Sequence, residues 1–193
     1  MNLSALTRAE LVNELLSPLN CASGTTPMHV SEAIAPVHLH GPADTVLAHR
    51  LEVARELLLR DLHEQLRRGP VMSSPQALRD WLRLYCTDLE HEVFLVLYLD
   101  AQHRLIETEE LFRGTLTQTS VYPREVVKGA LARNAAALAI AHNHPSGVAE
   151  PSRADELLTQ TLQSTRSLVD VRIIDHFVVA GEQIVSFAER GLM

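Results

Sequence analysis

An uninterrupted apolar run that leads into a histidine-rich turn is the feature that most limits how this chain can fold. Residues 135–141 read AAALAIA, as expected for a strand buried inside a sheet. The chain continues as HNHPSGVAEPSRAD, in which turn-forming Pro and Gly precede a Ser-x-x-Asp sequence that can start a helix. A buried strand, a turn and a helix in direct succession predict a sheet with helices packed on it.

The same stretch carries a candidate metal site. His142 and His144 point to one side of the strand end, because side chains alternate faces along an extended segment. Asp155 then lies one turn into the following helix, where its carboxylate can join the two imidazoles. An open set of nitrogen and oxygen ligands completed by water is typical of catalytic zinc. The alternative is a plain capping box, in which Ser152 and Asp155 only satisfy backbone amides at the helix start.

Two other sequence features are weaker metal candidates. VHLHGPAD at 37–44 is a second His-x-His sequence followed by a turn and an acid, but no apolar strand precedes it. Cys21 and Cys86 lie far apart without Cys-x-x-Cys spacing, which argues against a disulfide framework and against a thiolate zinc site.

The remaining chain changes from helical to extended patterns. Apolar residues recur at helical spacing over 44–68, and Ser74 with Pro75 begins a second helix. Strands are expected at 92–100, 105–112, 113–121 and 135–141 and as a closing pair within 171–191, with helices at 122–134 and 153–168. This order predicts a mixed sheet flanked by helices. We place the main domain at 71–193 and a small helical region at 1–70.

Charge and hydropathy limit the partners and the location. The net charge of −7 does not favour non-specific binding to nucleic acid. The arginines within 67–83 form a local exception, either as a solvated face or as a contact for a polyanion. No run approaches the ~18 apolar residues that cross a bilayer, and the first residues lack a secretory pattern. We therefore expect a cytoplasmic protein without a membrane partner.

HNHPSGVAEPSRAD resembles the JAMM signature of MPN domains, which are also called JAB domains: His-x-His-Pro followed at a fixed distance by Ser-x-x-Asp. VLYLDAQHRLIETEELFRGTL, VYPREVVKGALARNAAALAIAHNHPSG and DHFVVAGEQIVSFAERGL extend the resemblance to the bacterial RadC family over residues 71–193. The resemblance implies an α/β fold of the MPN type, a mixed sheet flanked by helices and layered like a cytidine deaminase. A small helical segment precedes it.

The resemblance also implies roles for the residues of the signature. His142, His144 and Asp155 would bind Zn²⁺ as cofactor. Ser152 would position the attacking water or stabilise the tetrahedral intermediate as a hydrogen-bond donor. A glutamate upstream of the signature would act as general base and pass the proton to the leaving amine.

That glutamate is assigned here to Glu92, because it immediately precedes the apolar run of the first expected strand. Glu90 would share a strand face with Glu92, and Glu109 and Glu110 lie on the second expected strand, so all three stay open as alternatives. Among other polar residues, we expect Asn143 to bond within its own loop. We expect Asp175-His176 to form a structural pair, with a pair that holds a ligand histidine as the alternative.

The function implied is a zinc-dependent hydrolase, a metallopeptidase or isopeptidase that cleaves a peptide or protein tail. The alternative is a non-catalytic accessory or scaffold in DNA repair, with a structural or vestigial metal; hydrolysis of a nucleotide or nucleic acid also stays open.

LHGPADTVLAHRLEVARELLLRDL resembles half of the helix-hairpin-helix that precedes many RadC domains, but it lacks the second glycine and carries Asp44. Nucleic acid is therefore a weakly supported partner. The oligomeric state stays open, since the 44–68 helix can pack on the main domain or pair with a second copy.

Overall fold

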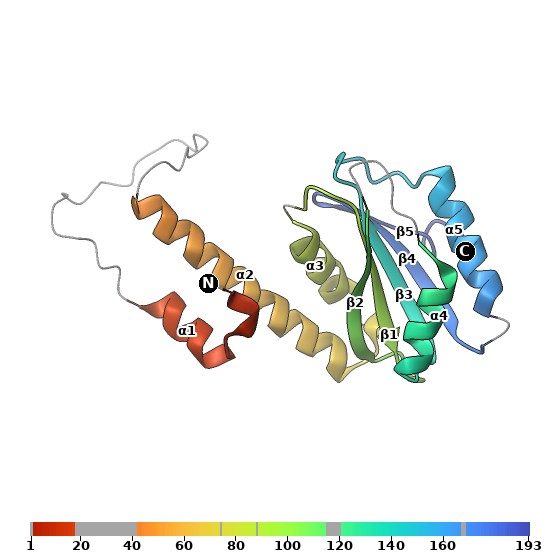
Figure 1. Cartoon of the computed structure of the whole chain (residues 1–193), viewed down its shortest axis with the longest axis horizontal. Coiled ribbons are helices and arrows are strands. Elements are labelled where there is room, and N and C mark those ends of the chain that lie inside the picture. The colour runs from red at the N-terminus through yellow and green to blue at the C-terminus, as the bar shows by residue number, and fades with distance from the viewer. Residues whose placement is uncertain (1, 18–41, 74, 88, 115–120, 167–168) are drawn as a thin grey trace. The chain divides into compact units, whose positions relative to one another are not determined.

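The computed structural model describes residues 2–17, 42–73, 75–87, 89–114, 121–166 and 169–193. Figure 1 labels the helices α1 (Arg8–Leu16), α2 (Pro42–Arg68), α3 (Pro75–Cys86), α4 (Pro123–Ala132) and α5 (Arg153–Arg166), and the strands β1 (Val93–Leu99), β2 (Leu105–Arg113), β3 (Ala137–Asn143), β4 (Arg172–Ala180) and β5 (Gln183–Ser186). This confirms the predicted α/β class. Most of the strand expected at 113–121 lies outside the described residues, as do Ser74, Cys21 and most of VHLHGPAD. No described helix is long and apolar enough to cross a membrane.

The chain divides into two compact units, residues 1–61 and 62–193, so the division falls inside α2. In the first unit, Leu11 of α1 and Val53 of α2 are fully buried. The Arg60 guanidinium donates to backbone carbonyls of residues 3, 4 and 6, which ties the start of the chain to α2. The predicted apolar stripe of α2 is only partly buried, because Leu47, Leu51 and Leu58 keep 49%, 59% and 54% of their surface exposed. Pairing of this helix with a second copy stays a prediction.

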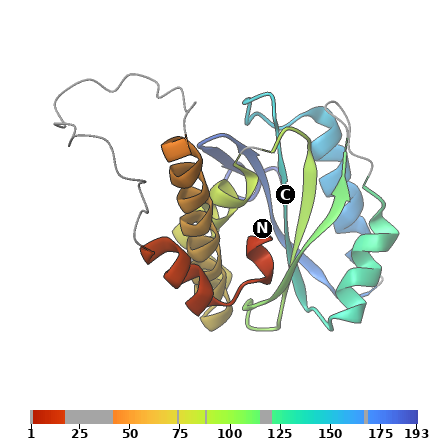
Figure 2. The same ribbon diagram turned by 60° about the vertical axis from the view of Figure 1, so that its left-hand side comes forward.

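The second unit is built on a five-stranded sheet with the order β2-β1-β3-β4-β5. β3 and β4 are parallel, and the other neighbouring strands are antiparallel. Every residue of β1 and of β3 is buried, which explains why both strands read as continuous apolar runs. Figure 2 shows α3 on one face of this sheet and α4 with α5 on the other.

The register between β1 and β3 determines which side chains face α4 and α5. Val96 pairs with Ile140, and both belong to the core cluster that also contains Val126 of α4 and Leu162 of α5. Two pairs further along, Phe94 lies opposite His142. Paired residues of neighbouring strands point to the same side, so His142 lies on the α4/α5 face at the edge of the apolar core.

An irregularity in the parallel pair β3–β4 changes which residues of β4 share that face. Leu138 pairs with Ile173, but the next pair is Ala139 with Asp175, so the register skips Ile174. A single extra residue reverses the alternation of a strand beyond the bulge. As a result His176, paired with Ile140, lies on the same side of the sheet as His142.

Candidate metal centre

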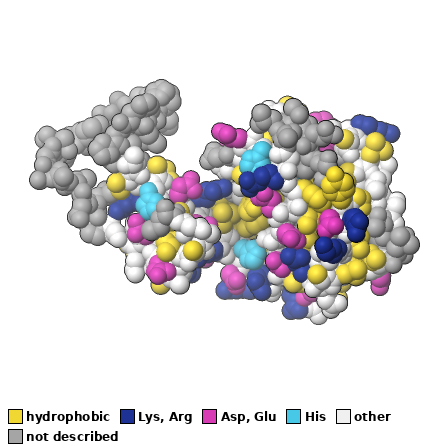
Figure 3. All heavy atoms as spheres, viewed as in Figure 1, with side chains coloured by type: hydrophobic (Ala, Val, Ile, Leu, Met, Phe, Trp, Pro, Cys, Tyr) yellow, Lys and Arg dark blue, Asp and Glu magenta, His cyan; other side chains and the backbone are white. Residues whose placement is uncertain are grey.

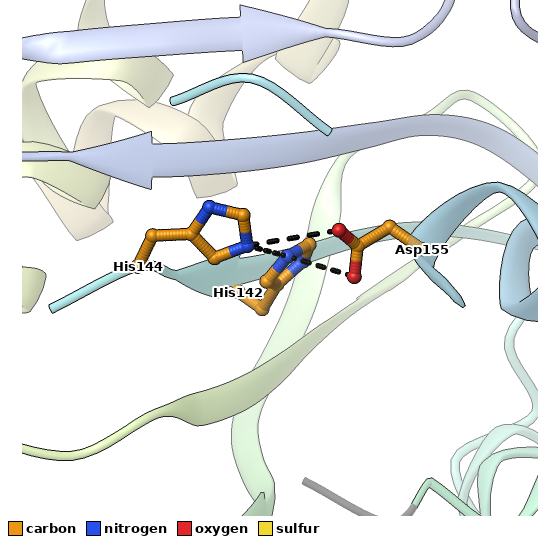
Figure 4. Close-up of side chains that lie close together, drawn as sticks. All are labelled: His142, His144 and Asp155. Carbon is orange, nitrogen blue, oxygen red and sulfur yellow. Dashed lines mark hydrogen bonds and ion pairs between the residues drawn. The ribbon is translucent and has the colours of Figure 1, made fainter. Parts of the chain in front are cut away.

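Three side chains bring one potential ligand atom each to the end of β3. The two Nε2 atoms of His142 and His144 lie 2.9 Å apart. Asp155 places Oδ1 3.2 Å from the Nε2 atom of His142 and Oδ2 3.6 Å from that of His144. Figure 4 shows the three side chains converging from the strand, the following loop and the start of α5. The residues expected to act together from their spacing are therefore neighbours in space.

The loop after β3 fixes the orientation of His144. The backbone N–H of His144 donates to the Val179 carbonyl (2.7 Å), and Gly147, with φ of +79°, donates back to the His144 carbonyl (3.0 Å). The Nδ1 atom of His144 lies 2.7 Å from the Val148 carbonyl oxygen. Because a carbonyl oxygen only accepts, this contact assigns the ring proton of neutral His144 to Nδ1. Its Nε2 lone pair then points at His142 and Asp155.

Asp155 takes part in a capping box and in the cluster at the same time. The Ser152 amide and hydroxyl donate to Oδ2 of Asp155 at 2.7 and 2.6 Å, and the Asp155 amide donates to the Ser152 hydroxyl oxygen at 3.3 Å. These contacts orient the carboxylate so that Oδ1 faces His142. The capping box and the ligand set, which we first treated as alternatives, are thus compatible. Here the Ser152 hydroxyl is engaged with Asp155, and its role toward water or substrate stays a prediction.

The cluster favours a negative carboxylate and a bound cation. Burial opposes the charge of Asp155, but its contacts with His142 and His144 and the hydrogen bond from Ser152 outweigh it and lower the pKa of Asp155. The hydrogen bond to Asp155 is the main cause that raises the pKa of His144, and the charge of Glu92 adds to it. A positive charge beside the carboxylate is therefore favoured, and a bound metal ion would supply it.

Glu92 immediately precedes β1. The pairing of β1 with β3 ends with Phe94 opposite His142, two residues after Glu92 and two residues before His144. The Glu92 carbonyl accepts from the amide of Gly114 at 2.8 Å, which ties this point to the end of β2. The contribution of the Glu92 charge to the pKa of His144 is consistent with a place near this cluster.

The alternative glutamates have other surroundings. Glu90 is exposed. Glu109 accepts from the Tyr98 hydroxyl at 2.7 Å and pairs with Arg133 at 3.2 Å. Glu110 accepts from the Tyr85 hydroxyl at 3.3 Å and pairs with Arg113 at 2.9 Å. The carboxylates of Glu109 and Glu110 are thus engaged in hydrogen bonds and ion pairs within the second unit. Glu92 therefore remains the favoured candidate for the base.

One expectation about polar residues near the cluster was wrong, and another was right for one of its two residues. Asn143 does not bond within its own loop; its side chain accepts from the Val93 amide (2.7 Å) and donates to the His91 carbonyl (3.0 Å). Asp175 has the expected structural role and also accepts from the His176 amide at 2.7 Å, while the His176 ring contacts a candidate ligand histidine, as the alternative predicted. Asp175 accepts from the Ser186 hydroxyl at 2.6 Å, whereas the His176 ring lies 2.9 Å from the His142 ring. The skipped residue in β4 separates their roles, and no sequence pattern indicated it.

The arginine cluster within 67–83 is partly explained by internal contacts. Arg79 binds the Glu189 carboxylate at 2.6 Å, and Arg83 donates to the Glu182 carbonyl at 2.8 Å. Both therefore fasten α3 to the segments around β5, which weakens the case for a polyanion contact. Figure 3 shows basic and acidic side chains intermixed on the visible face of the second unit.

A mixed sheet whose buried central strand delivers His-x-His to an aspartate in the first turn of a helix defines the class of JAB-type domains. The family model described as "RadC-like JAB domain" matches residues 72–192. The chain is 67% identical over 143 residues to a UPF0758 protein of Leptothrix cholodnii, and 56% identical over 185 residues to one of Methylibium petroleiphilum. The chain belongs to the RadC family.

The chain matches only part of the length of each of these relatives, and slightly less than two thirds of the Leptothrix protein. The alignment with the Leptothrix protein covers 74% of this chain and 64% of the relative, and that with the Methylibium protein covers 95% and 81%. A UPF0758 protein of Dechloromonas aromatica is 51% identical over 185 residues, which cover 95% of this chain and 80% of the relative. The range matched by the family model includes the candidate metal centre, while the printed names of the relatives state no activity.

Proposed function

We propose that this protein is a zinc-dependent hydrolase of the JAMM type that cleaves an amide or isopeptide bond. The observation that carries the proposal is the convergence of two imidazole nitrogens and one carboxylate at 2.9 to 3.6 Å from one another. Donor atoms about 2.0–2.2 Å from one tetrahedral zinc ion lie roughly 3.4 Å apart, so the donor set and its spacing fit this metal.

An open site supports a catalytic metal over a structural one. Among the residues that the structure describes, the cluster has three members: His142, His144 and Asp155. A structural zinc site would need a fourth protein ligand, whereas a catalytic site keeps that position for water or substrate. A bound Zn²⁺ would lower the pKa of a water molecule and polarise the carbonyl group of the substrate.

The chain's own residues would supply the proton transfers and the orientation. The Glu92 carboxylate would accept the proton of the attacking water and deliver it to the leaving amine. The Ser152 hydroxyl, once turned away from Asp155, would donate to the carbonyl oxygen as negative charge develops there. The favoured substrate is a peptide or a protein tail, as the family resemblance implies.

The test is hydrolysis of a peptide library made from a bacterial proteome, with isopeptide-linked peptides added. Zinc-loaded wild-type protein should generate new amino groups that mass spectrometry can locate. Glu92→Gln should lower the rate by about 10²–10⁴-fold, because it removes the base but keeps the side-chain shape. Glu90→Gln is the matched control and should stay close to wild type.

Two outcomes would decide against parts of the proposal. No cleavage by wild-type protein with full zinc occupancy would contradict the hydrolase and favour the accessory or scaffold role in DNA repair. Cleavage by Glu92→Gln at the wild-type rate would retain the hydrolase and remove Glu92 as its base.

A further inference from the structure

A chain of buried polar contacts runs from His142 into α5. The Nδ1 atom of His142 lies 2.9 Å from the Nε2 atom of His176, and the Nδ1 atom of His176 lies 2.7 Å from the Thr159 hydroxyl oxygen. That hydroxyl donates to the backbone carbonyl of Asp155 at 2.7 Å. The exposed fractions are 7% for His142 and 0% for both His176 and Thr159, so these contacts are shielded from bulk solvent.

The direction of each hydrogen bond follows from the last acceptor. A carbonyl oxygen cannot donate, so the single hydrogen of the Thr159 hydroxyl serves the Asp155 carbonyl. The hydroxyl oxygen then accepts from Nδ1–H of His176. His176 is fully buried between the rings of Phe94 and Phe187, where a charged imidazolium is unfavourable, so its ring is neutral. Its Nε2 atom therefore lacks a proton and accepts from Nδ1–H of His142.

The opposite direction loses one of the three hydrogen bonds of this chain, the one from Thr159 to the Asp155 carbonyl, while Nε2–H of His142 would instead donate to the Asp155 carboxylate. If the Thr159 hydroxyl donated to His176, it could not also donate to Asp155, because it has one hydrogen. His176 would then donate from Nε2, and neutral His142 would carry its proton on the Nε2 atom that faces Asp155. The observed contacts satisfy all three hydrogen bonds only when the proton of His142 lies on Nδ1.

We propose that Thr159 and His176 are positioning residues that fix the ring proton of His142 on Nδ1, so that its Nε2 lone pair points to the metal position. This inference rests on the proposed zinc site. Asp155 lies at both ends of this chain of contacts, because its backbone carbonyl accepts the hydrogen bond from Thr159 and its carboxylate faces His142. A neutral imidazole in this place differs from the usual carboxylate or carbonyl partner of a ligand histidine.

The surroundings of His176 hold its ring in place. Phe187 stacks on it with ring centroids 4.6 Å apart, and Phe94 meets its edge at 6.1 Å. These apolar rings offer no other hydrogen-bond partner to the His176 nitrogens. The skipped residue in β4 brings His176 to this side of the sheet, so the hydrogen-bond chain depends on that local irregularity.

The test removes one hydroxyl from the chain of contacts. Thr159→Val keeps the side-chain shape but leaves Nδ1–H of His176 without an acceptor, so the proton of His176 should move to Nε2 and that of His142 to its own Nε2. Long-range ¹H–¹⁵N NMR of the metal-free protein reports where each ring carries its proton. The wild type should show the His142 proton on Nδ1, and Thr159→Val should shift a substantial fraction to Nε2.

Zinc affinity gives a second readout, measured by competition with a chelator. Thr159→Val should bind zinc about 10–100-fold more weakly than wild type. Thr159→Ser should rescue both readouts because it restores the hydroxyl. Thr161→Val is the matched control: Thr161 makes the same hydrogen bond to the carbonyl four residues earlier (2.8 Å) but lies at the exposed side of α5.

The outcomes separate this inference from the proposed function. Wild-type proton positions in Thr159→Val, or equal loss of affinity in Thr159→Ser, would overturn the positioning role. A wild type that binds no zinc would overturn the proposed function, while the NMR measurement would still decide where His142 carries its proton. Should Thr159→Val fail to fold, Thr159→Ala tests the same point.

Discussion

Three consecutive residues at the end of β3 serve two sides of the sheet. His142 and His144 contribute nitrogen atoms to the metal centre. Asn143, between them, points the other way and binds the backbone on both sides of Glu92, at His91 and Val93. The strand alternation that presents two ligands therefore also provides the residue that fixes the segment of the candidate base.

Asn143→Ala should lower the free energy of unfolding by about 1–3 kcal/mol, because the buried Val93 amide loses its acceptor. Chemical denaturation of the metal-free protein measures the change. Gln160→Ala, which removes an exposed amide side chain from α5, is the control and should change it by less than about 0.5 kcal/mol. A similar small effect for Asn143→Ala would show that this contact does not stabilise the second unit.

At this scale the sequence is informative about some residues and silent about others. The spacing of His142, His144 and Asp155 follows simple strand and helix geometry, and their side chains do converge. The contact of Thr159 could not be predicted, because a polar residue in an amphipathic helix has many ordinary explanations. The contact of His176 with a candidate ligand histidine was an alternative to a purely structural role, and the sequence did not decide between them.

The bulge in β4 is the element that most changes the surroundings of the metal centre. Ile173 and Ile174 are both apolar, so the sequence does not indicate which of them the pairing skips. Regular alternation from Ile173 would have put Asp175 on the side of His142. Strand positions were therefore predictable from apolar patterns, whereas the face of each residue beyond the bulge was not.

The close approach of α4 to β1 gives a second prediction for an element. A Cβ atom at Gly129 would lie 2.2 Å from Oη and 3.0 Å from Cζ of Tyr98, a side chain that is fully buried. Gly129→Ala should lower the free energy of unfolding by about 1–3 kcal/mol, because the core must shift. Chemical denaturation measures this cost.

Tyr98→Phe supplies the control for Gly129→Ala. It removes the nearest clashing atom, so the cost of Gly129→Ala should be smaller by at least about 0.5 kcal/mol in that background. Strictly additive effects of the two substitutions would contradict a clash between them.

For the whole molecule, the spacing of apolar residues and the turn-forming residues predicted the α/β class. The extent to which α2 is buried could not be predicted in the same way. A helical spacing of leucines shows which residues share a face, but it does not show whether a partner covers that face. Leu66, in the second unit, is buried, whereas Leu51 and Leu58, in the first, are more than half exposed. The predicted boundary at residue 70 stays a prediction beside the observed division at residue 61.

The stability of the second unit should depend on pH through His63. Burial is the main cause that lowers the pKa of His63 below 6.5, and Arg67 adds to it; the ring lies 6.3 Å from that of Trp81. The folded state therefore favours neutral His63, and the unfolded chain binds its proton first as pH falls through 6.5. The free energy of unfolding should therefore decrease as the pH is lowered below about 6.5.

His63→Gln should reduce this loss, because the variant has no proton to bind at this position. The measurement is the difference in unfolding free energy between about pH 7.5 and about pH 5.5 for both metal-free proteins. His176, whose pKa is also lowered by burial, acts in the same direction and remains in the variant. An unchanged difference would mean that His63 does not contribute to acid destabilisation.

The zinc content of the purified, untagged protein tests the central claim most directly. Mass spectrometry should find about one zinc ion per chain in the wild type and in Glu92→Ala, but little in His144→Ala. His49→Ala, a substitution in the first unit, is the control and should keep the metal. Zinc lost from Glu92→Ala as well would make Glu92 a ligand of a closed structural site. A wild type without metal after zinc is supplied would contradict the metal centre and the hydrolase together.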